Sequence, residues 1–353
     1  MKCVGIRVSS SDELTPPLPN LVTPVTEVPK WRALLANQLT VLLVILVVLM
    51  VLLGNHNSRF FTSSEMSFLL ADFSGLVLVA VAETFVIISG GIDLSVGSVM
   101  AVSGVLAARA MQPLINSHTN EAVVLLLGTA VALVVGMLAG AINATLIVGF
   151  NVVPFVATLA MWYGGQGLAL VWTGGQPYGL NPGAQTWSAA TIPGVPFMSW
   201  LSLIVIGITV VLGLVLRKAR YGRYTFAIGS NNFAARAAGI SVQRYVGSFY
   251  VLSGALAGLT GMFFDIRLGS GAPTTGQTTT LIAIAAVVIG GTSLFGGSGT
   301  YLGTVLGAAI LIVVQDGAIF VNVSANWVPV VVASVVAVAS IIQSGRLRLR
   351  RRS

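Results

Sequence analysis

The chain consists of long apolar stretches joined by short polar connections, and the apolar stretches carry few charges. Residues 122–216 contain no Asp, Glu, Lys or Arg, and neither do residues 268–315. Stretches such as Val41–Leu53 are apolar on every side, without the alternation of polar and apolar positions seen in the strands of membrane barrels. About 20 mainly apolar residues are enough for a helix to cross a bilayer. The pattern therefore predicts an all-α, polytopic membrane protein.

About ten transmembrane helices fit this pattern, and the third and eighth are short and flanked by glycines. The predicted spans cover Leu34–Gly54, Phe68–Ser89, Leu94–Met111, Ala122–Gly149, Val152–Trp172, Trp200–Leu216, Tyr245–Leu268, Leu281–Leu294, Tyr301–Phe320 and Trp327–Gln343. Glycine recurs at every fourth position in three places, which indicates close packing between helices. These glycines are Gly136/Gly140, Gly254/Gly258 and Gly299/Gly303/Gly307.

The composition excludes a soluble globular protein. Of the 353 residues, 56% are hydrophobic and only 8% are charged, whereas an ordinary soluble domain has roughly 25% charged residues. The polar, proline-rich residues 1–30 are predicted to form a flexible cytoplasmic tail, and residues 31–345 a membrane domain containing a cytoplasmic loop at 217–244. Residues 346–353 form a basic cytoplasmic tail. The single cysteine, Cys3, cannot form an intramolecular disulfide.

The charges predict how the chain is oriented in the membrane. With ten spans, 15 of the 18 Lys and Arg residues lie on the side that holds both termini and the 217–244 loop, and only Arg59, Arg109 and Arg267 do not. Because basic residues gather on the cytoplasmic side, both termini are predicted to be cytoplasmic. The net charge of +8 therefore does not indicate nucleic-acid binding. The basic C-terminal run RLRLRR is predicted to contact anionic lipid headgroups, with a specific partner as the alternative.

No pattern of residues predicts catalysis. A Walker A motif needs a lysine that follows a glycine, and none of Lys2, Lys30 and Lys218 does. The sequence contains no HExxH, no CxxC and no pair of histidines that predicts a metal site. We therefore expect no enzymatic activity, no metal and no cofactor bound by this chain.

The junction Phe85–Ser98 is the first candidate site. Two adjacent glycines free the backbone, and Asp93 and Ser95 are suited to cap the next helix. Two readings stay open: a break beside a translocation path, or a helix–turn–helix joint with Asp93 as N-cap. Glu83, inside the second span, contacts a polar substrate or a proton in one reading and packs as a neutral group in the other. The candidates for the path are Glu83, Ser89, Gly90, Gly91, Asp93, Ser95 and Gly97.

The loop 217–244 is the second candidate site. It holds six basic residues and no acidic one. Phe233–Ala238 is predicted to form a short helix, capped by the pair Asn231-Asn232 and ended by Gly239. A short helix in a cytoplasmic loop favours docking of a soluble partner over a plain loop that only carries positive charge.

Three motifs, in this order, resemble one family. They are ISGGIDLSVGS, YGRYTFAIGSNNFAARAAGI and AIAAVVIGGTSLFGGSGTYLGTVLGA, within residues 65–343. The chain resembles permease subunits of bacterial ABC sugar importers of the ribose, xylose, arabinose and galactose type, part of a superfamily that includes branched-chain amino acid permeases. The resemblance implies a multi-pass protein of the bacterial inner membrane. It also implies a second permease subunit, identical or paralogous, a cytoplasmic ABC ATPase that binds ATP-Mg, and an extracytoplasmic sugar-binding protein.

The resemblance further implies a coupling helix at about Asn231–Gly239 and a monosaccharide as substrate. The candidate coupling residues are Gly222, Arg223, Gly229, Asn231, Ala234, Ala235, Arg236 and Gly239. One alternative is an ABC permease for nucleosides or branched-chain amino acids. A second is an ion-coupled secondary transporter with Glu83 or Asp93 as the coupling group.

Overall fold

The computed structural model describes residues 37–338, and the structure below refers to these residues. The predicted tails, residues 1–30 and 346–353, lie outside them. In chain order the elements are α2 (Gln38–His56), η1 (Ser58–Phe61), α3 (Ser63–Ile88), α4 (Val96–Asn116), α5 (Glu121–Ala144), the π-helical η2 (Thr145–Gly149), α6 (Pro154–Thr173), β1 (Tyr178–Gly179), α7 (Pro182–Ala189), β2 (Thr191–Ile192), β3 (Val195–Ser199), α8 (Trp200–Lys218), α9 (Arg220–Ser230), α10 (Asn232–Ala237), α11 (Val242–Leu268), β4 (Ser270–Gly271), α12 (Thr279–Ile289), α13 (Tyr301–Phe320) and η3 (Ala325–Trp327), which opens the helical stretch Ala325–Val338.

The all-α membrane fold is confirmed. Within residues 37–338, seven helices are long and apolar enough to cross a membrane: α2, α3, α4, α5 with η2, α8, α11 and α13. The other three predicted segments contain helix, namely α6, the 11-residue α12, which ends at Ile289, and Ala325–Val338. Residues 339–343 of the last predicted span lie outside the described residues. An 11-residue helix reaches only about half-way across a bilayer. The number of ten spans therefore stays a prediction.

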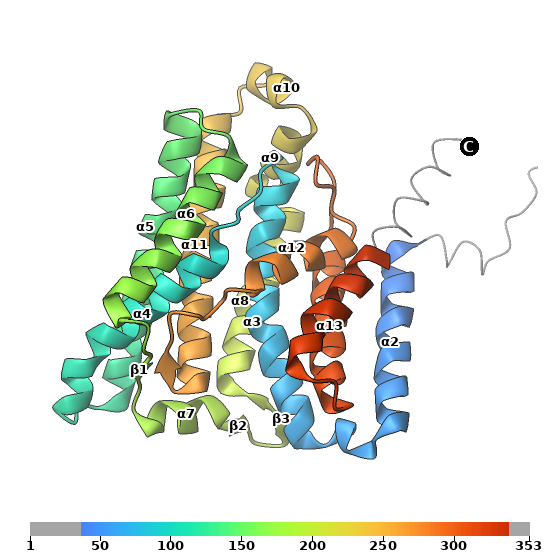
Figure 1. Cartoon of the computed structure of the whole chain (residues 1–353). Coiled ribbons are helices and arrows are strands. Elements are labelled where there is room, and N and C mark those ends of the chain that lie inside the picture. The colour runs from blue at the N-terminus through green and yellow to red at the C-terminus, as the bar shows by residue number, and fades with distance from the viewer. Residues whose placement is uncertain (1–36, 339–353) are drawn as a thin grey trace, which may run out of the picture. The chain divides into compact units, whose positions relative to one another are not determined.

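Helix α3 forms the centre of the bundle (Figure 1). Every residue from Ser74 to Ile88 is buried, and α11, α13, α8 and α12 pack around the helix. By contrast, only Leu42 is buried in α2. Both helices are mainly apolar, which suits a protein core and a lipid surface, so position in the bundle decides which helix is enclosed.

The predicted glycine contacts are present at two helix crossings. A side chain on Gly136 of α5 would overlap the carbonyl oxygen of Gly254 on α11, and a side chain on Gly254 would overlap that of Gly136. Likewise, Gly303 of α13 leaves no room for a side chain beside the carbonyl oxygen of Gly290, directly after α12. Helices that meet through glycine bring their backbones together, which fixes the crossing tightly.

The segment 217–244 differs from the prediction in one respect. A loop with one short helix was expected, but residues Arg220–Ser230 also form a helix, α9. Hydropathy did not predict this helix, because α9 packs on the bundle through a few spaced residues rather than through a continuous apolar stretch. Gly222, Thr225 and Ile228 are its buried positions.

Candidate functional site

The junction between α3 and α4 is an elbow built around glycine. Helix α3 ends where Gly91 N–H donates to the carbonyl of Val86 and Gly90 N–H donates to that of Ile87, with φ +91° at Gly90. Only glycine adopts this conformation without strain. The chain then runs back along the bundle as an extended segment before α4 begins at Val96 (Figure 1).

Asp93 joins three elements at this elbow. Its Oδ1 accepts from the Ser95 backbone N–H at 3.0 Å and from the Ser95 hydroxyl at 2.5 Å, and its Oδ2 accepts from the Ser253 hydroxyl of α11 at 2.8 Å. Asn143 of α5 donates from Nδ2 to Ser95 Oγ at 2.8 Å. One interpretation of the sequence made Asp93 the N-cap of α4, and the structure shows that it is not. The N-cap is Ser95, whose hydroxyl bonds Asp93 instead of the helix backbone.

We expect Asp93→Ala to lower the free energy of unfolding by about 3 kcal/mol, because the buried donors of Ser95 and Ser253 would lose their acceptor. Asp93→Asn keeps an acceptor oxygen and should lose much less. The thermal midpoint of the detergent-purified protein measures both effects. An alanine variant as stable as the wild type would show that the Asp93 contacts do not hold the elbow together.

Glu83 lies beneath the elbow with its carboxyl group fully buried. Among residues 37–338, neither its carboxylate oxygens nor the buried Tyr250 hydroxyl has a hydrogen-bond partner. Gly91 leaves space for that hydroxyl, since a side chain at this position would overlap it. The other path candidates differ in exposure: Asp93, Ser95 and Gly97 are buried, Ser89 is half-buried and Gly90 is exposed. The elbow is thus mostly enclosed within this chain.

Gly97 lies where two helices begin side by side. Its backbone N–H donates to Thr280 Oγ1 of α12 at 2.8 Å, and a side chain here would overlap the carbonyl oxygen of Gly276. This contact brings the polar segment Pro273–Thr280 against the start of α4. Sequence reasoning did not select this segment. The sequence feature that could have identified it is a cluster of Thr and Gln residues inside the uncharged stretch 268–315.

The second candidate site is a short helix that projects from α9, as Figure 1 shows for α10. Asn231 caps it, accepting at Oδ1 from Ala234 N–H at 3.0 Å, and Gly239 follows it with φ +81°. The predicted short helix and its stop are confirmed. Ala235 is buried and faces the protein, whereas Ala234 and Arg236 are exposed, and Phe233 is 86% exposed.

Helix α9 connects this projecting helix to the bundle core. Gly229 fits against the end of α3, because a side chain there would overlap the carbonyl oxygen of Ile88. Gly222 similarly fits against the carbonyl of Leu216 in α8. The remaining coupling candidate, Arg223, is exposed and donates from Nη1 to the Lys218 carbonyl at 2.9 Å.

An aromatic cluster adds a second link between α9 and the core. The ring of Tyr221 lies 5.7 Å from that of Phe85 on α3 and 5.1 Å from that of Phe249 on α11, measured between centroids. Its hydroxyl shares a 2.9 Å hydrogen bond with the Ser248 hydroxyl. Burial raises the pKa of Tyr221 to about 12, so the phenol stays neutral at physiological pH. Rings packed in this way move together with the helices that carry them.

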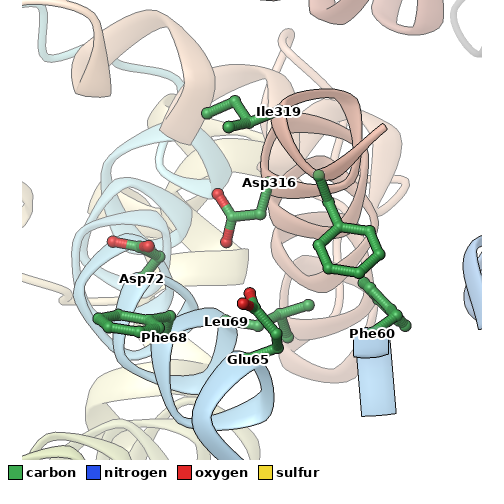
Figure 2. Close-up of a pocket in the computed structure, with 8 residues that line it drawn as sticks. Phe60, Glu65, Phe68, Leu69, Asp72, Asp316 and Ile319 are labelled. Carbon is green, nitrogen blue, oxygen red and sulfur yellow. The ribbon is translucent and has the colours of Figure 1, made fainter. Parts of the chain in front are cut away.

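A pocket of about 350 Å³ lies between the N-terminal part of α3 and the C-terminal end of α13 (Figure 2). Glu65, Asp72 and Asp316 line it together with aromatic rings, and Arg267 of α11 forms an ion pair with Asp72. Across the described part of the chain, no group of three or more His, Cys, Asp or Glu is arranged to hold a metal ion. The ion pair joins the N-terminal half of α3 to the C-terminal end of α11.

Comparison with known proteins places the chain in a family. Residues 65–342, which include every candidate residue of both sites, match the family described as branched-chain amino acid transport system / permease component. The chain belongs to this permease family. It is a transport component rather than an enzyme.

Individual relatives agree with this assignment. The ribose import permease protein RbsC of Escherichia coli K12 is 36% identical over 290 residues, which cover 81% of this chain and 87% of the relative. The ribose import permease protein RbsC of Bacillus subtilis 168 is 37% identical over 75% of this chain and 80% of its own length. The fructose import permease protein FruF of Bifidobacterium longum is 34% identical over 79% and 77%.

Proposed function

We propose that this chain is the membrane-spanning subunit of an ABC importer and forms the translocation path for a monosaccharide. The identity to ribose import permeases over four-fifths of the chain carries the proposal. The exposed helix α10 supports it, because a permease that has no Walker A motif needs a surface on which an ATPase can dock.

The partners follow from this function. Two permease subunits, identical or paralogous, enclose the path, and an extracytoplasmic binding protein delivers the sugar. A cytoplasmic ABC ATPase binds ATP-Mg, so this chain binds no cofactor itself. The protein lies in the bacterial inner membrane with both termini in the cytoplasm, where the tails at 1–30 and 346–353 flank the membrane domain. The basic tail contacts lipid headgroups.

The ATPase docks on an apolar and basic surface around α10. Phe233 on α10 and Phe295, which is 95% exposed in the connection between α12 and α13, are its apolar groups. Figure 1 shows this connection reaching toward α9, where Ser230 Oγ donates to the Gly297 carbonyl at 3.4 Å. Large exposed apolar side chains on one surface are typical of protein interaction sites. The basic residues of the 217–244 loop favour a partner with acidic groups.

Movement of this surface reaches the path through α9. When ATP closes the two ATPase domains, α10 is displaced together with α9. Helix α9 pushes on the end of α3 at Gly229 and on Phe85 through Tyr221. Because α3 is enclosed by α11, α12 and α13, its displacement changes how these helices pack around the elbow.

A pull-down from native membranes tests this function. The tagged protein, purified in mild detergent, should bring with it a P-loop ATPase that mass spectrometry identifies. Phe233→Ser should reduce ATPase recovery about tenfold, because loss of one central aromatic anchor typically costs more than 1 kcal/mol. Phe150→Ser is the matched control, since Phe150 is 72% exposed but lies outside the 217–244 loop. Recovery of the protein alone, with gradient-driven uptake in liposomes, would contradict the ABC function and favour secondary transport.

A further inference from the structure

A polar ledge lies on the surface of the chain where α6 passes the segment before α12. It consists of Trp162, Tyr163 and Gln166 of α6 with Thr274, Gln277 and Thr278. Gln166 holds the two parts together by donating from Nε2 to the Pro273 carbonyl at 2.6 Å. The rings of Trp162 and Tyr163 lie 4.9 Å apart between centroids.

The contacts of the ledge place it at the depth of the membrane interior. Ser98 Oγ of α4 donates to the carbonyl of Met161, near the middle of the 20-residue α6. Two further contacts lie along α4: Gly271 packs against Ala108, and Gly276 packs against Gly97. The segment 271–276 thus runs beside α4, which is itself long enough to span the membrane.

The ledge is nevertheless exposed. Tyr163 is 69% exposed, and Thr274, Gln277 and Thr278 are exposed as well. The backbone between Ala272 and Thr278 is not helical and is held by turn-type hydrogen bonds. Lipid cannot satisfy the polar groups of such backbone, and irregular backbone at this depth occurs only against protein or a water-filled cavity. The ledge therefore faces away from lipid.

The chemistry of the ledge fits a neutral ligand with many hydroxyl groups. Thr hydroxyls and Gln amides offer both donors and acceptors, and the aromatic rings offer flat apolar faces for the carbon skeleton of such a ligand. The uncharged runs 122–216 and 268–315 supply every residue of the ledge. A free amino acid, with its carboxylate and ammonium groups, would find no partner of opposite charge there.

We propose that the polar ledge lines the aqueous path and contacts a monosaccharide, with the second permease subunit forming the opposite wall. This inference rests on the proposed transport function. It goes further by assigning the residues that contact the solute and by separating a neutral polyhydroxylated solute from an amino acid.

A cysteine scan tests the aqueous path. In a Cys3→Ser background the chain has no other cysteine, so Thr274→Cys, Gln277→Cys, Thr278→Cys and Tyr163→Cys can be probed one at a time. Native membrane vesicles of both orientations, which retain the assembled transporter, are treated with a charged, membrane-impermeant methanethiosulfonate. Leu126→Cys is the control for a lipid-facing position, because Leu126 is 71% exposed on the apolar helix α5. Ser117→Cys, exposed in the connection after α4, is the control for free access to water.

The ledge positions should react at least about 100-fold faster than Leu126→Cys, since the charged reagent does not enter hydrocarbon. Reaction as slow as that of Leu126→Cys, with Ser117→Cys fully reactive, would overturn the aqueous path. Ribose or another monosaccharide should slow the ledge reaction, whereas leucine should not. Protection by leucine, by a nucleoside alone or by none of these solutes would overturn the assigned contact. The pull-down tests the ABC function separately, so the two failures are distinguishable.

Discussion

Gly254→Leu should prevent the protein from folding. Gly254 of α11 and Gly136 of α5 approach so closely that a side chain on either would overlap the carbonyl oxygen of the other. Gly258 makes the same kind of contact with the carbonyl of Ala132, one turn further along α11. Since the overlapping atoms belong to backbone, rotation of a side chain cannot relieve the clash, and the helices have to separate. Overpacking of this kind costs about 3 kcal/mol or more, a large part of the stability of an ordinary domain.

Size-exclusion chromatography of the detergent-solubilised, fluorescently tagged protein measures the effect. Gly254→Leu should lose the monodisperse peak or lower its thermal midpoint strongly. The matched control is Gly207→Leu, because Gly207 lies in helix α8 with no atom within 4 Å of an added Cβ. If Gly254→Leu kept the peak and midpoint of Gly207→Leu, close approach of α5 and α11 would not be what holds this crossing.

Hydropathy alone predicts much of this fold, because the apolar stretches are long and their ends carry glycine or capping residues. It fails for α9, whose polar sequence is helical only because spaced residues such as Ile228 pack on the bundle. Contacts with α11 and α13 enclose α3, and mean hydropathy does not predict this, because it is higher for the peripheral α2 than for α3. Tertiary packing, not local propensity, sets these two features.

The candidate sites were located by local patterns, but their partners were not. The glycine pair and Asp93 marked the elbow, yet the groups that bond to Asp93 or its partner Ser95 include Ser253 and Asn143, which are far apart in the sequence. The polar segment Pro273–Thr280 was not predicted as part of a site, because Thr and Gln also occur commonly in ordinary surface loops. Only the structure reveals that it packs against α4, a helix long enough to cross a membrane.

Gly229→Ala should separate ATPase binding from transport. Gly229 is the point at which α9 meets the end of α3, where even a single methyl group would overlap the Ile88 carbonyl oxygen and crowd the Gly297 N–H. That N–H donates to the same Ile88 carbonyl at 2.8 Å, so three segments meet around one oxygen atom. The methyl group should push α9 away from α3, while the side chain of Phe233 on α10 stays exposed and accessible to the ATPase.

We therefore expect sugar uptake into cells to fall about tenfold, since a mutation at a transmitting contact changes the coupling free energy by roughly 0.5–2 kcal/mol. ATPase recovery in the pull-down should remain close to that of the wild type. Gly207→Ala serves as the control, because it adds the same methyl group where no atom lies within 4 Å. Normal uptake by folded Gly229→Ala would show that force does not pass from α9 to α3 at this point. Loss of the ATPase from the complex would instead assign Gly229 to the docking surface. A defect in transmission requires that the ATPase still binds.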